Sequence, residues 1–531
     1  MRTKKLRQVL RASFGKAPDP YYHDGDMHYI RAYFDFRREH ALDSFLIDDI
    51  TWNDLDMDRL YRRINPKRST SGEQYLYYML RSPAVDSEHY DHRKKLIDYA
   101  QADEERRLTV ETILARLGCS RRADLCRAFY PSKHGAGMLL FYLVCLLLMV
   151  ASVICTLLHI SFGVRALLAS ILINCYVHEF GRRRSQRDYD TVNYIVNMVF
   201  AVQKLRKLHD PELDAQMQPV YESMDRLRAV IRTGGVFTGM DSGGMEDAIL
   251  TATLLDLITY EYLKNKLGRC HDDVFTIHEY LGQLDAAISI ASYRASVDVY
   301  TEPVLQFDFV NSRHIHAKGL IHPLLAGAVP NDCITEQSFL ITGSNASGKS
   351  TYLKAVALAA IMAQSICTVT AHSYSSGAFR IFTSMALDDD LLHGESYYIA
   401  ETKSIKRIID AAKEYCFVLC VIDEVLRGTN TVERIAAASV VLEELAEIGV
   451  LCFAATHDLE LCDLLQNCYS LYHFEEQIVD GEMLFDYILR TGKATTRNAI
   501  YLLALIGFDQ RIVSKALERA DRYISVGAWK D

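Results

Sequence analysis

The longest uninterrupted apolar pattern lies in the first half of the chain. Residues 135–158 run for 24 positions without a charged side chain, and about 20 helical residues are enough to cross the apolar core of a bilayer. A second apolar segment, residues 160–177, contains a single Lys, Arg, Asp or Glu, Arg165, near its start. The pair predicts a transmembrane helical hairpin over residues 135–178, with a tight turn beginning near His159.

Basic residues stand on both outer sides of this hairpin. Because positively charged flanks stay on the cytoplasmic side of a membrane, both long arms of the chain are expected in the cytoplasm. Apart from His159 and Arg165 the two segments carry no charged group, which favours an anchor over a transport path. The alternative is a hairpin buried in a soluble core, although core helices rarely run this long without a polar face. The flanking residues are Arg121, Arg122, Arg127 and Lys133 before the hairpin, and Arg182, Arg183, Arg184 and Arg187 after it.

Short apolar runs in the C-terminal half predict buried strands that end in polar residues. The stretch "SFLITGSNASGKST", residues 338–351, has the pattern of a strand, a glycine-bearing turn and the start of a helix. Backbone N–H groups in such a turn face an anion. Lys349 can reach the outer phosphates of a nucleotide, and Ser350 can hold Mg²⁺. The predicted phosphate-binding residues are Gly343, Ser344, Asn345, Ala346, Ser347, Gly348, Lys349, Ser350 and Thr351.

Two further runs end in candidate catalytic residues. Asp423 and Glu424 follow the apolar run 418–422, and carboxylates at the end of such a strand meet the ligand crevice of an open α/β sheet. We expect Asp423 to support Mg²⁺ and Glu424 to act as general base on the attacking water. In "VLCFAATHDLE" the apolar strand ends in Thr456 and His457, and His457 can sense the terminal phosphate. Without the upstream loop, Asp423 and Glu424 would be interpreted as solvated acids at a strand end, and His457 as a surface histidine. The loop favours a site for ATP and Mg²⁺ instead.

Composition limits the classes of function. The chain has 531 residues, of which 50% are hydrophobic and 24% charged, so it can bury large cores. A net charge of −9 argues against a uniformly basic nucleic-acid surface, but not against a local basic face. The 13 cysteines form no C-x-x-C pair, which indicates reduced thiols and no zinc site. The start, "MRTKKLRQVLRASFGK", is basic and lacks the apolar core of a secretory signal.

The ordered motifs resemble those of the MutS family of mismatch-repair ATPases, which belongs to the ABC-type ATPases. "GSNASGKST" is similar to the family's Gly-Pro-Asn-x-x-Gly-Lys-Ser-Thr, and "DEVLRGTNT" to its Asp-Glu-x-x-x-Gly-Thr. "ATHDLEL" resembles the family's Ala-Thr-His, and "IHPLL", residues 321–325, the His-Pro pair that opens its nucleotide domain. The likeness is strongest from about residue 320 to 460 and covers most of residues 45–520.

The resemblance implies further site residues and a dimer. In "RIFTSMALDDDLLHGESYYIAET", residues 380–402, the family's signature serine falls on Ser396, which would act on the nucleotide of the partner subunit. Such a composite site implies a homodimer holding two nucleotides. Glu401 stands where the family has a Glu, and Tyr487 where it often has an aromatic residue or His near the base. The resemblance also implies DNA as a partner.

Several departures from the family pattern qualify this expectation. About 40 residues precede the helical core, and they contain no Gly-x-Phe-x-Glu wedge, so a member lacking the mismatch-reading domain is expected. Basic and acidic residues alternate between 188 and 232, which favours a solvated face over a DNA-binding stripe. The loop has Ser344, Ala346 and Ser347 where the family favours Pro, a large apolar residue and Gly. Glu395 would place a negative charge near the partner's phosphates.

The expected fold class is an α/β P-loop (ABC-type) ATPase domain in the C-terminal half, preceded by an all-α lever and core domain that the transmembrane hairpin interrupts. The expected domains are a basic tail (1–44), the first part of the core (45–134), the hairpin (135–178), the lever and second part of the core (179–300), the ATPase domain (301–480) and a C-terminal helical dimerisation segment (481–531).

The expected function is that of a membrane-anchored MutS-like ATPase that hydrolyses ATP at a dimer interface and couples it to a conformational change, with DNA as the partner that the family suggests. The alternative is an ATP-dependent membrane scaffold or transporter-like subunit acting on a protein or membrane partner. The inward-positive flanks and the family's habit suggest the inner (cytoplasmic) membrane, with the ATPase domain and the N-terminus in the cytoplasm.

Overall fold

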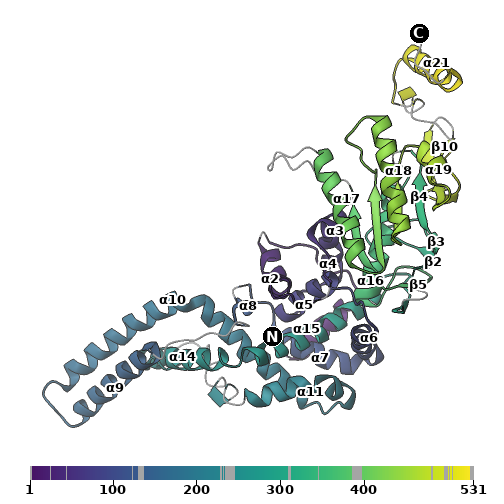
Figure 1. Cartoon of the computed structure of the whole chain (residues 1–531). Coiled ribbons are helices and arrows are strands. Elements are labelled where there is room, and N and C mark those ends of the chain that lie inside the picture. Colours follow the sequence, from purple (N-terminus) through teal and green to yellow (C-terminus); the bar gives the residue numbers. More distant parts are fainter. Residues whose placement is uncertain are drawn as a thin grey trace. The chain divides into compact units, whose positions relative to one another are not determined.

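The structure is a computed structural model that divides the chain into two compact units (Figure 1). The first unit contains residues 1–43, 64–78 and 95–296, and the second contains residues 44–63, 79–94 and 297–531. The described residues are 3–23, 25–43, 45–121, 123–128, 137–227, 230, 232–233, 245–308, 313–344, 346–385, 397–479, 482–494, 500, 503–504 and 506–526.

The first unit is helical. Its longest elements are α9 (Gly137–Leu157), α10 (Gly163–Arg206) and α15 (His271–Arg294), and α15 is buried along most of its length. Helices α5 (Thr70–Arg81) and α6 (Ser87–Ala102) each have residues in both units. The other helices are α1 (Thr3–Ser13), α2 (Asp26–Glu39), α7 (Glu104–Leu117), α8 (Leu125–Ala128), α11 (Pro211–Arg226), α13 (Met245–Thr253) and α14 (Leu255–Leu267).

Helices α9 and α10 form the hairpin drawn at the lower left of Figure 1. The turn is tight: Ile160 N–H donates to Cys155 O at 3.0 Å, and a Cβ at Gly163 would lie 2.7 Å from the backbone nitrogen of Thr156. Glycine is therefore required where the helices meet. The predicted end of the hairpin at residue 178 falls inside α10, which runs for 44 residues without a break.

Of the described helices, α9 is the one that length and composition would allow to cross a membrane. Only 17% of its most apolar window of 18 residues is buried. Large apolar side chains on both helices are exposed, among them Leu148 at 63% and Leu172 at 70%. The sequence predicted two spanning helices, whereas the structure offers one candidate span and a second, longer helix packed beside it.

Polar side chains join this hairpin to α13 and α14. Asn174, on α10, donates from Nδ2 to Ala252 O at 2.6 Å, and one helical turn later His178 Nε2 lies 2.7 Å from Asp256 Oδ2. All three of these side chains are at least nine-tenths buried. They meet the break between α13 and α14, where Leu254 has a φ of 54°. The sequence offered no sign of this contact because the partners lie 78 residues apart.

The basic N-terminus is a helix that is bound to the first unit. Arg7 and Arg11, on α1, form ion pairs with Glu104 and Glu105 at the start of α7. In the segment 188–232 the sequence favoured a solvated face over a DNA-binding stripe. Two basic residues of this segment are likewise paired with acids: Arg206 with Asp225, and Arg226 with Asp273. These contacts agree with the solvated, charge-balanced face that the sequence favoured.

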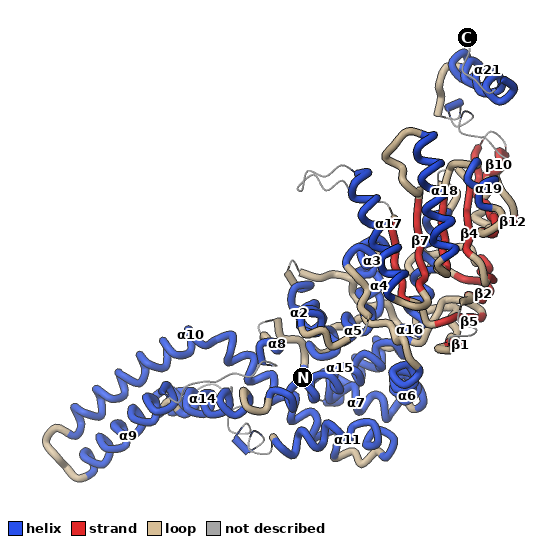
Figure 2. The backbone as a smooth tube through the Cα atoms, in the orientation of Figure 1, coloured by secondary structure: helices blue, strands red, loops and turns tan. Residues whose placement is uncertain are grey.

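The second unit contains the strands, drawn red in Figure 2. Six of them form a sheet in the order β12-β9-β4-β8-β7-β6. All neighbouring strands are parallel except β12 and β9. A four-stranded sheet has the order β1-β5-β2-β3, and β10 pairs with β11. The strands are β1 (Val304–Gln306), β2 (Ile315–Leu320), β3 (Asn331–Thr335), β4 (Ser338–Thr342), β5 (Ser373–Gly377), β6 (Arg380–Ser384), β7 (Val418–Asp423), β8 (Leu451–Ala455), β9 (Tyr469–His473), β10 (Glu476–Val479), β11 (Glu482–Phe485) and β12 (Arg490–Thr491).

Helices cover this sheet. Helix α16 packs on β7 and β8, α17 on β6 and β7, and α18 on β8. Strands β4 and β8 are buried at every position, which explains their continuous apolar sequences. The helices of this unit are α3 (Asp49–Asp54), α4 (Met57–Ile64, whose last residue falls in the first unit), α16 (Lys349–Ile366), α17 (Tyr397–Glu414), α18 (Thr431–Glu447), α19 (Glu460–Leu465) and α21 (Gln510–Val526).

The strand register brings three predicted motifs to one edge of the sheet. Ala455, the last residue of β8, is paired with Ile341 of β4 on one side and with Asp423 of β7 on the other. The loop after β4, the carboxylates at the end of β7 and the histidine after β8 therefore leave the sheet side by side.

Candidate functional site

The loop between β4 and α16 has the backbone that its glycines predict. Gly343 and Gly348 have φ values of 143° and 108°, which side-chain-bearing residues rarely adopt. A Cβ at Gly343 would lie 2.8 Å from Phe474 O, and one at Gly348 would lie 3.2 Å from the Tyr487 ring. Ala346 also has a positive φ, 64°. The loop is wrapped closely between α16 and the segments that follow β9 and β11.

Lys349 holds this loop together. Its Nζ donates to Gly343 O at 2.9 Å and to Ser344 O at 2.7 Å. The residue is only 5% exposed. Burial lowers the pKa of Lys349, and the carboxylates of Asp423, Glu424 and Glu476 act in the opposite direction. The ammonium group is thus positioned at the loop, among carboxylates, where an anion would meet it.

Asp423 and Ser350 lie together beside the loop. Burial raises the pKa of Asp423, and a hydrogen bond from the Ser350 side chain offsets part of that rise. Among the described residues, Asp423 Oδ1 is buried and has no hydrogen-bond partner, and the same is true of Ser347 Oγ. A carboxylate oxygen and a hydroxyl with open bonding positions are suitable groups for a hard cation and for a phosphate.

Glu424 is held by three contacts at the end of β7. Its N–H donates to Ala455 O at 3.0 Å, its Oε1 lies 3.0 Å from His457 Nε2, and its Oε2 lies 2.9 Å from Arg427 Nη1. Its φ of 58° is uncommon for a residue with a side chain. Strain of this kind is found where a fold fixes a functional side chain.

Glu401, on α17, braces the loop that follows Glu424. Its Oε1 accepts from Arg427 N–H at 3.3 Å, and burial raises its pKa. A Cβ at Gly428 would lie 2.8 Å from the Cβ of Tyr398 on the same helix. The beginning of α17 therefore lies directly against residues 424–428.

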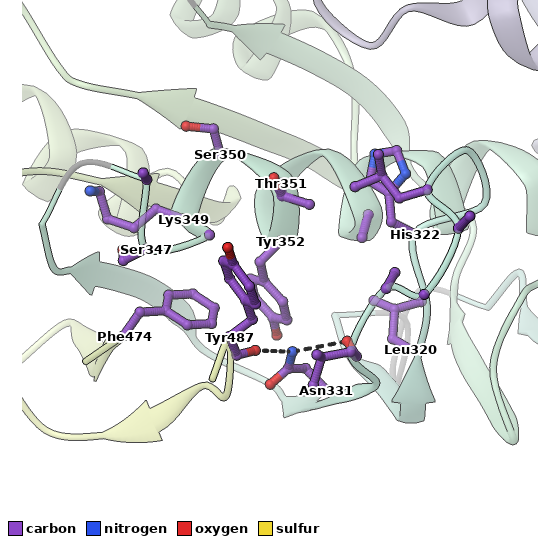
Figure 3. Close-up of a pocket in the computed structure, with 18 of the residues that line it drawn as sticks. Leu320, His322, Asn331, Ser347, Lys349, Ser350, Thr351, Tyr352, Phe474 and Tyr487 are labelled. Atoms are coloured by element: carbon purple, nitrogen blue, oxygen red, sulfur yellow. Dashed lines mark hydrogen bonds between the residues drawn. The ribbon is translucent and has the colours of Figure 1, made fainter. Parts of the chain in front are cut away.

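A cavity of about 440 Å³ opens beside the loop (Figure 3). It is lined by loop residues 346–351 and Glu424, and by the rings of Tyr352, Phe474 and Tyr487. Figure 3 shows these rings near the start of α16, with Asn331 donating from Nδ2 to Tyr487 O at 2.9 Å. His322 also lines the cavity, where burial lowers its pKa to about 4. The cavity offers aromatic faces next to a loop suited to phosphates.

The structure brings together most of the residues that the sequence singled out. Gly343, Ser344, Gly348, Lys349, Ser350, Asp423, Glu424 and His457 lie at one sheet edge, and Ala346, Ser347, Thr351 and Tyr487 line the cavity. Asn345 and Ser396 lie outside the described residues, so their assignments stay predictions. Sequence reasoning missed Asn331, Phe474 and Glu476, because strand order rather than a motif brings them to the loop, and it missed Tyr352, which directly follows the loop motif in α16.

These features define a protein with a parallel α/β sheet and a phosphate-loop motif at its edge. A family model described as MutS domain V matches residues 339–523, a range that contains the loop, Asp423, Glu424 and His457. Through this part the chain is similar to the MutS family.

Curated relatives show the same similarity. The chain is 31% identical over 271 residues to "DNA mismatch repair protein MutS 2" of Halobacterium salinarum, which covers 49% of this chain and 30% of that protein. It is 32% identical to "DNA mismatch repair protein MutS" of Bacillus cytotoxicus, over 45% of this chain and 27% of the relative. The protein of the same name from Pseudothermotoga lettingae is 32% identical, over 49% of this chain and 32% of that relative. The chain spans about a third or less of the length of these relatives.

Proposed function

We propose that the second unit binds and hydrolyses ATP at the sheet edge. The observation that carries this proposal is the convergence of the phosphate loop, the Asp423–Ser350 pair and the Glu424–His457 pair. Each motif has a common structural explanation when it stands alone. Their meeting beside one cavity is expected of a nucleotide hydrolase.

The side chains have distinct roles in this proposal. Lys349 would turn from the loop carbonyls to the outer phosphates, and Ser347 Oγ, which lacks a partner among the described residues, would donate to a phosphate oxygen. Ser350 and Asp423 would hold Mg²⁺, which neutralises phosphate charge when it is bound. The rings of Tyr352, Phe474 and Tyr487 would receive the base.

Glu424 would accept the proton of the attacking water. The contacts with His457 and Arg427 fix both carboxylate oxygens, so the base is oriented before the substrate arrives. His457 is 37% exposed through its side chain, which lets it respond to a bound phosphate. Ser396 would complete the site of the partner subunit in a homodimer, as the family resemblance implies.

The hairpin supports a membrane-anchored form of this ATPase. Helix α9 is apolar and largely unburied, and the first part of α10 exposes apolar side chains beside it. Burying this surface in lipid would remove it from water. The proposed location is the inner (cytoplasmic) membrane, after the family's habit, and the basic flanks support placing both arms in the cytoplasm.

DNA is proposed as the partner that regulates turnover. The similar proteins are named as DNA mismatch repair proteins, which supports this proposal. The pairing of Arg206 and Arg226 with acids speaks for the competing proposal, in which the ATPase acts on a membrane or protein partner.

The test is ATP turnover by the detergent-purified full chain, with and without duplex, mismatched and branched DNA at one low salt concentration. We expect Mg²⁺-dependent turnover that Lys349→Ala abolishes, because this change removes the cation at the loop. Stimulation by a DNA structure would identify the ligand class. Turnover that ignores all DNA would leave the ATPase and reject DNA coupling, and absence of turnover and of nucleotide binding would reject the ATPase itself.

A further inference from the structure

A buried carboxylate that no predicted motif contains is attached to the phosphate loop. Glu476, the first residue of β10, accepts from Ser344 Oγ through its Oε2 at 2.8 Å. Glu476 is only 4% exposed, and within the described part of the chain its other oxygen, Oε1, is buried without a hydrogen-bond partner. A charged oxygen left without a partner in the interior is costly, so its retention calls for a functional explanation.

Ser344 is held from two sides. Its carbonyl oxygen accepts from Lys349 Nζ at 2.7 Å, and its hydroxyl donates to Glu476 at 2.8 Å. Only one residue therefore separates the ammonium group from this carboxylate. The charge of Glu476 acts on Lys349, in the same sense as the charges of Asp423 and Glu424. Asp423 and Glu424 already have proposed roles in the reaction, whereas Glu476 has none.

We propose that Glu476 sets the preference of the site between ATP and ADP, an inference that rests on the proposed nucleotide binding. The terminal phosphate of ATP adds negative charge near Lys349, where the buried carboxylate already lies. Two like charges repel more strongly in a protein interior than in water. Glu476 therefore weakens ATP binding more than ADP binding, and the loop releases ATP readily until another event, such as dimer closure, stabilises it.

The neighbouring Glu475 provides a matched control. Successive residues of an extended chain point to opposite sides, and Glu475 lies near His473 and Arg490 instead of the loop. Its side chain is 29% exposed. Glu475→Gln removes the same formal charge at almost the same place in the sequence, without touching Ser344.

The experiment is equilibrium binding of ATP and of ADP to the full chain, without divalent cation so that hydrolysis does not interfere. Glu476→Gln keeps an oxygen acceptor for Ser344 and removes the charge. We expect it to tighten ATP binding about tenfold and ADP binding about threefold or less, so that the ratio of the two dissociation constants changes. Glu475→Gln should leave that ratio unchanged.

Ser344→Ala separates charge from scaffolding. This variant loses the hydrogen bond but keeps the carboxylate, so a purely structural role for Glu476 predicts that it will behave like Glu476→Gln. Equal changes in ATP and ADP affinity in Glu476→Gln, or no change, would overturn the inference while nucleotide binding itself stands. If the unaltered chain binds neither nucleotide, the proposed function fails first, and this inference falls with it.

Discussion

The sheet edge and the hairpin differ in how many of their buried polar groups are partnered. At the sheet edge, buried polar atoms such as Asp423 Oδ1, Ser347 Oγ and Glu476 Oε1 have no partner among the described residues. In the hairpin, Ser152 lies 3.2 Å from Ser170, Asn174 bonds to Ala252 O and His178 contacts Asp256, while the apolar side chains face outward. Open polar valences suit a site that receives a charged ligand. The polar groups of the hairpin are mostly paired under an exposed apolar surface, which suits a medium that cannot hydrogen-bond, although Asp256 Oδ1 is also buried without a partner among the described residues.

The sharpest test of the first half of this comparison is Glu424→Gln. The change keeps the shape of the side chain but removes the base, so we expect ATP hydrolysis to fall about 100- to 10,000-fold while nucleotide binding persists. Steady-state turnover and equilibrium binding measure the two effects separately. Glu443→Gln, at an exposed position on α18, is the control for loss of a carboxylate from the same unit. If Glu424→Gln hydrolyses ATP at the parent rate, Glu424 is not the general base.

Charge placed on the hairpin surface tests the second half. Leu148→Arg and Leu172→Arg should each oppose membrane insertion by about 2.5–3.5 kcal/mol, because an arginine near the bilayer centre is costly. Flotation of the purified chain with liposomes measures the effect. Val432→Arg, at a position that is 79% exposed in the second unit, is the matched control and should float like the parent. If both hairpin variants also float like the parent, the exposed apolar surface has another partner.

Breaking the His178–Asp256 pair tests whether the polar contacts of the hairpin stabilise it. His178→Ala removes the partner of a buried carboxylate and should destabilise the chain by about 1–3 kcal/mol. The double variant His178→Leu/Asp256→Leu removes both groups and should recover part of that loss, because no unpaired charge remains. Thermal unfolding in detergent compares the variants. If the double variant is less stable than the single one, the pair stabilises the chain beyond offsetting the cost of burying its two polar groups.

Much of the sheet edge could be predicted because its signals are local. The apolar runs that become β4, β7 and β8, and the glycines of the loop, specify their own conformations within a few residues. That Asp423 lies beside Ala455, and Ala455 beside Ile341, depends on strand register, which the motifs suggested only through the family resemblance. Glu476 was missed because it meets Ser344 across 132 residues of sequence.

The hairpin shows the opposite balance. Apolar length predicted helices near residues 135–178, and the tight turn falls where the sequence placed it. Composition alone did not predict that α10 continues to Arg206. An amphipathic helix can follow an apolar one without a break, so the end of the apolar run does not mark the end of the helix. Nor could it pair His178 with Asp256, since neither residue belongs to a recognisable pattern.

A last test compares the buried histidines of the two regions through the response of the sheet edge to pH. His322 has no carboxylate partner like that of His178 among the contacts described for it; its Nδ1 accepts from Leu324 N–H at 3.2 Å. Burial, with smaller effects of Lys354 and Arg59, lowers its pKa from 6.5 to about 4, and the charge of Asp56 acts in the opposite direction. Because the folded state holds the neutral form, this contribution is complete above pH 6.5 and is lost as the pH falls through 4.

His322→Asn keeps an acceptor near the position of Nδ1 but cannot be protonated in this range. Between pH 6.5 and 4 the parent should lose up to about 3 kcal/mol more unfolding free energy than the variant, as measured by denaturant titration at each pH. Parallel pH profiles would mean that His322 is protonated equally well in the folded and unfolded chains, and that the cavity wall is open to water.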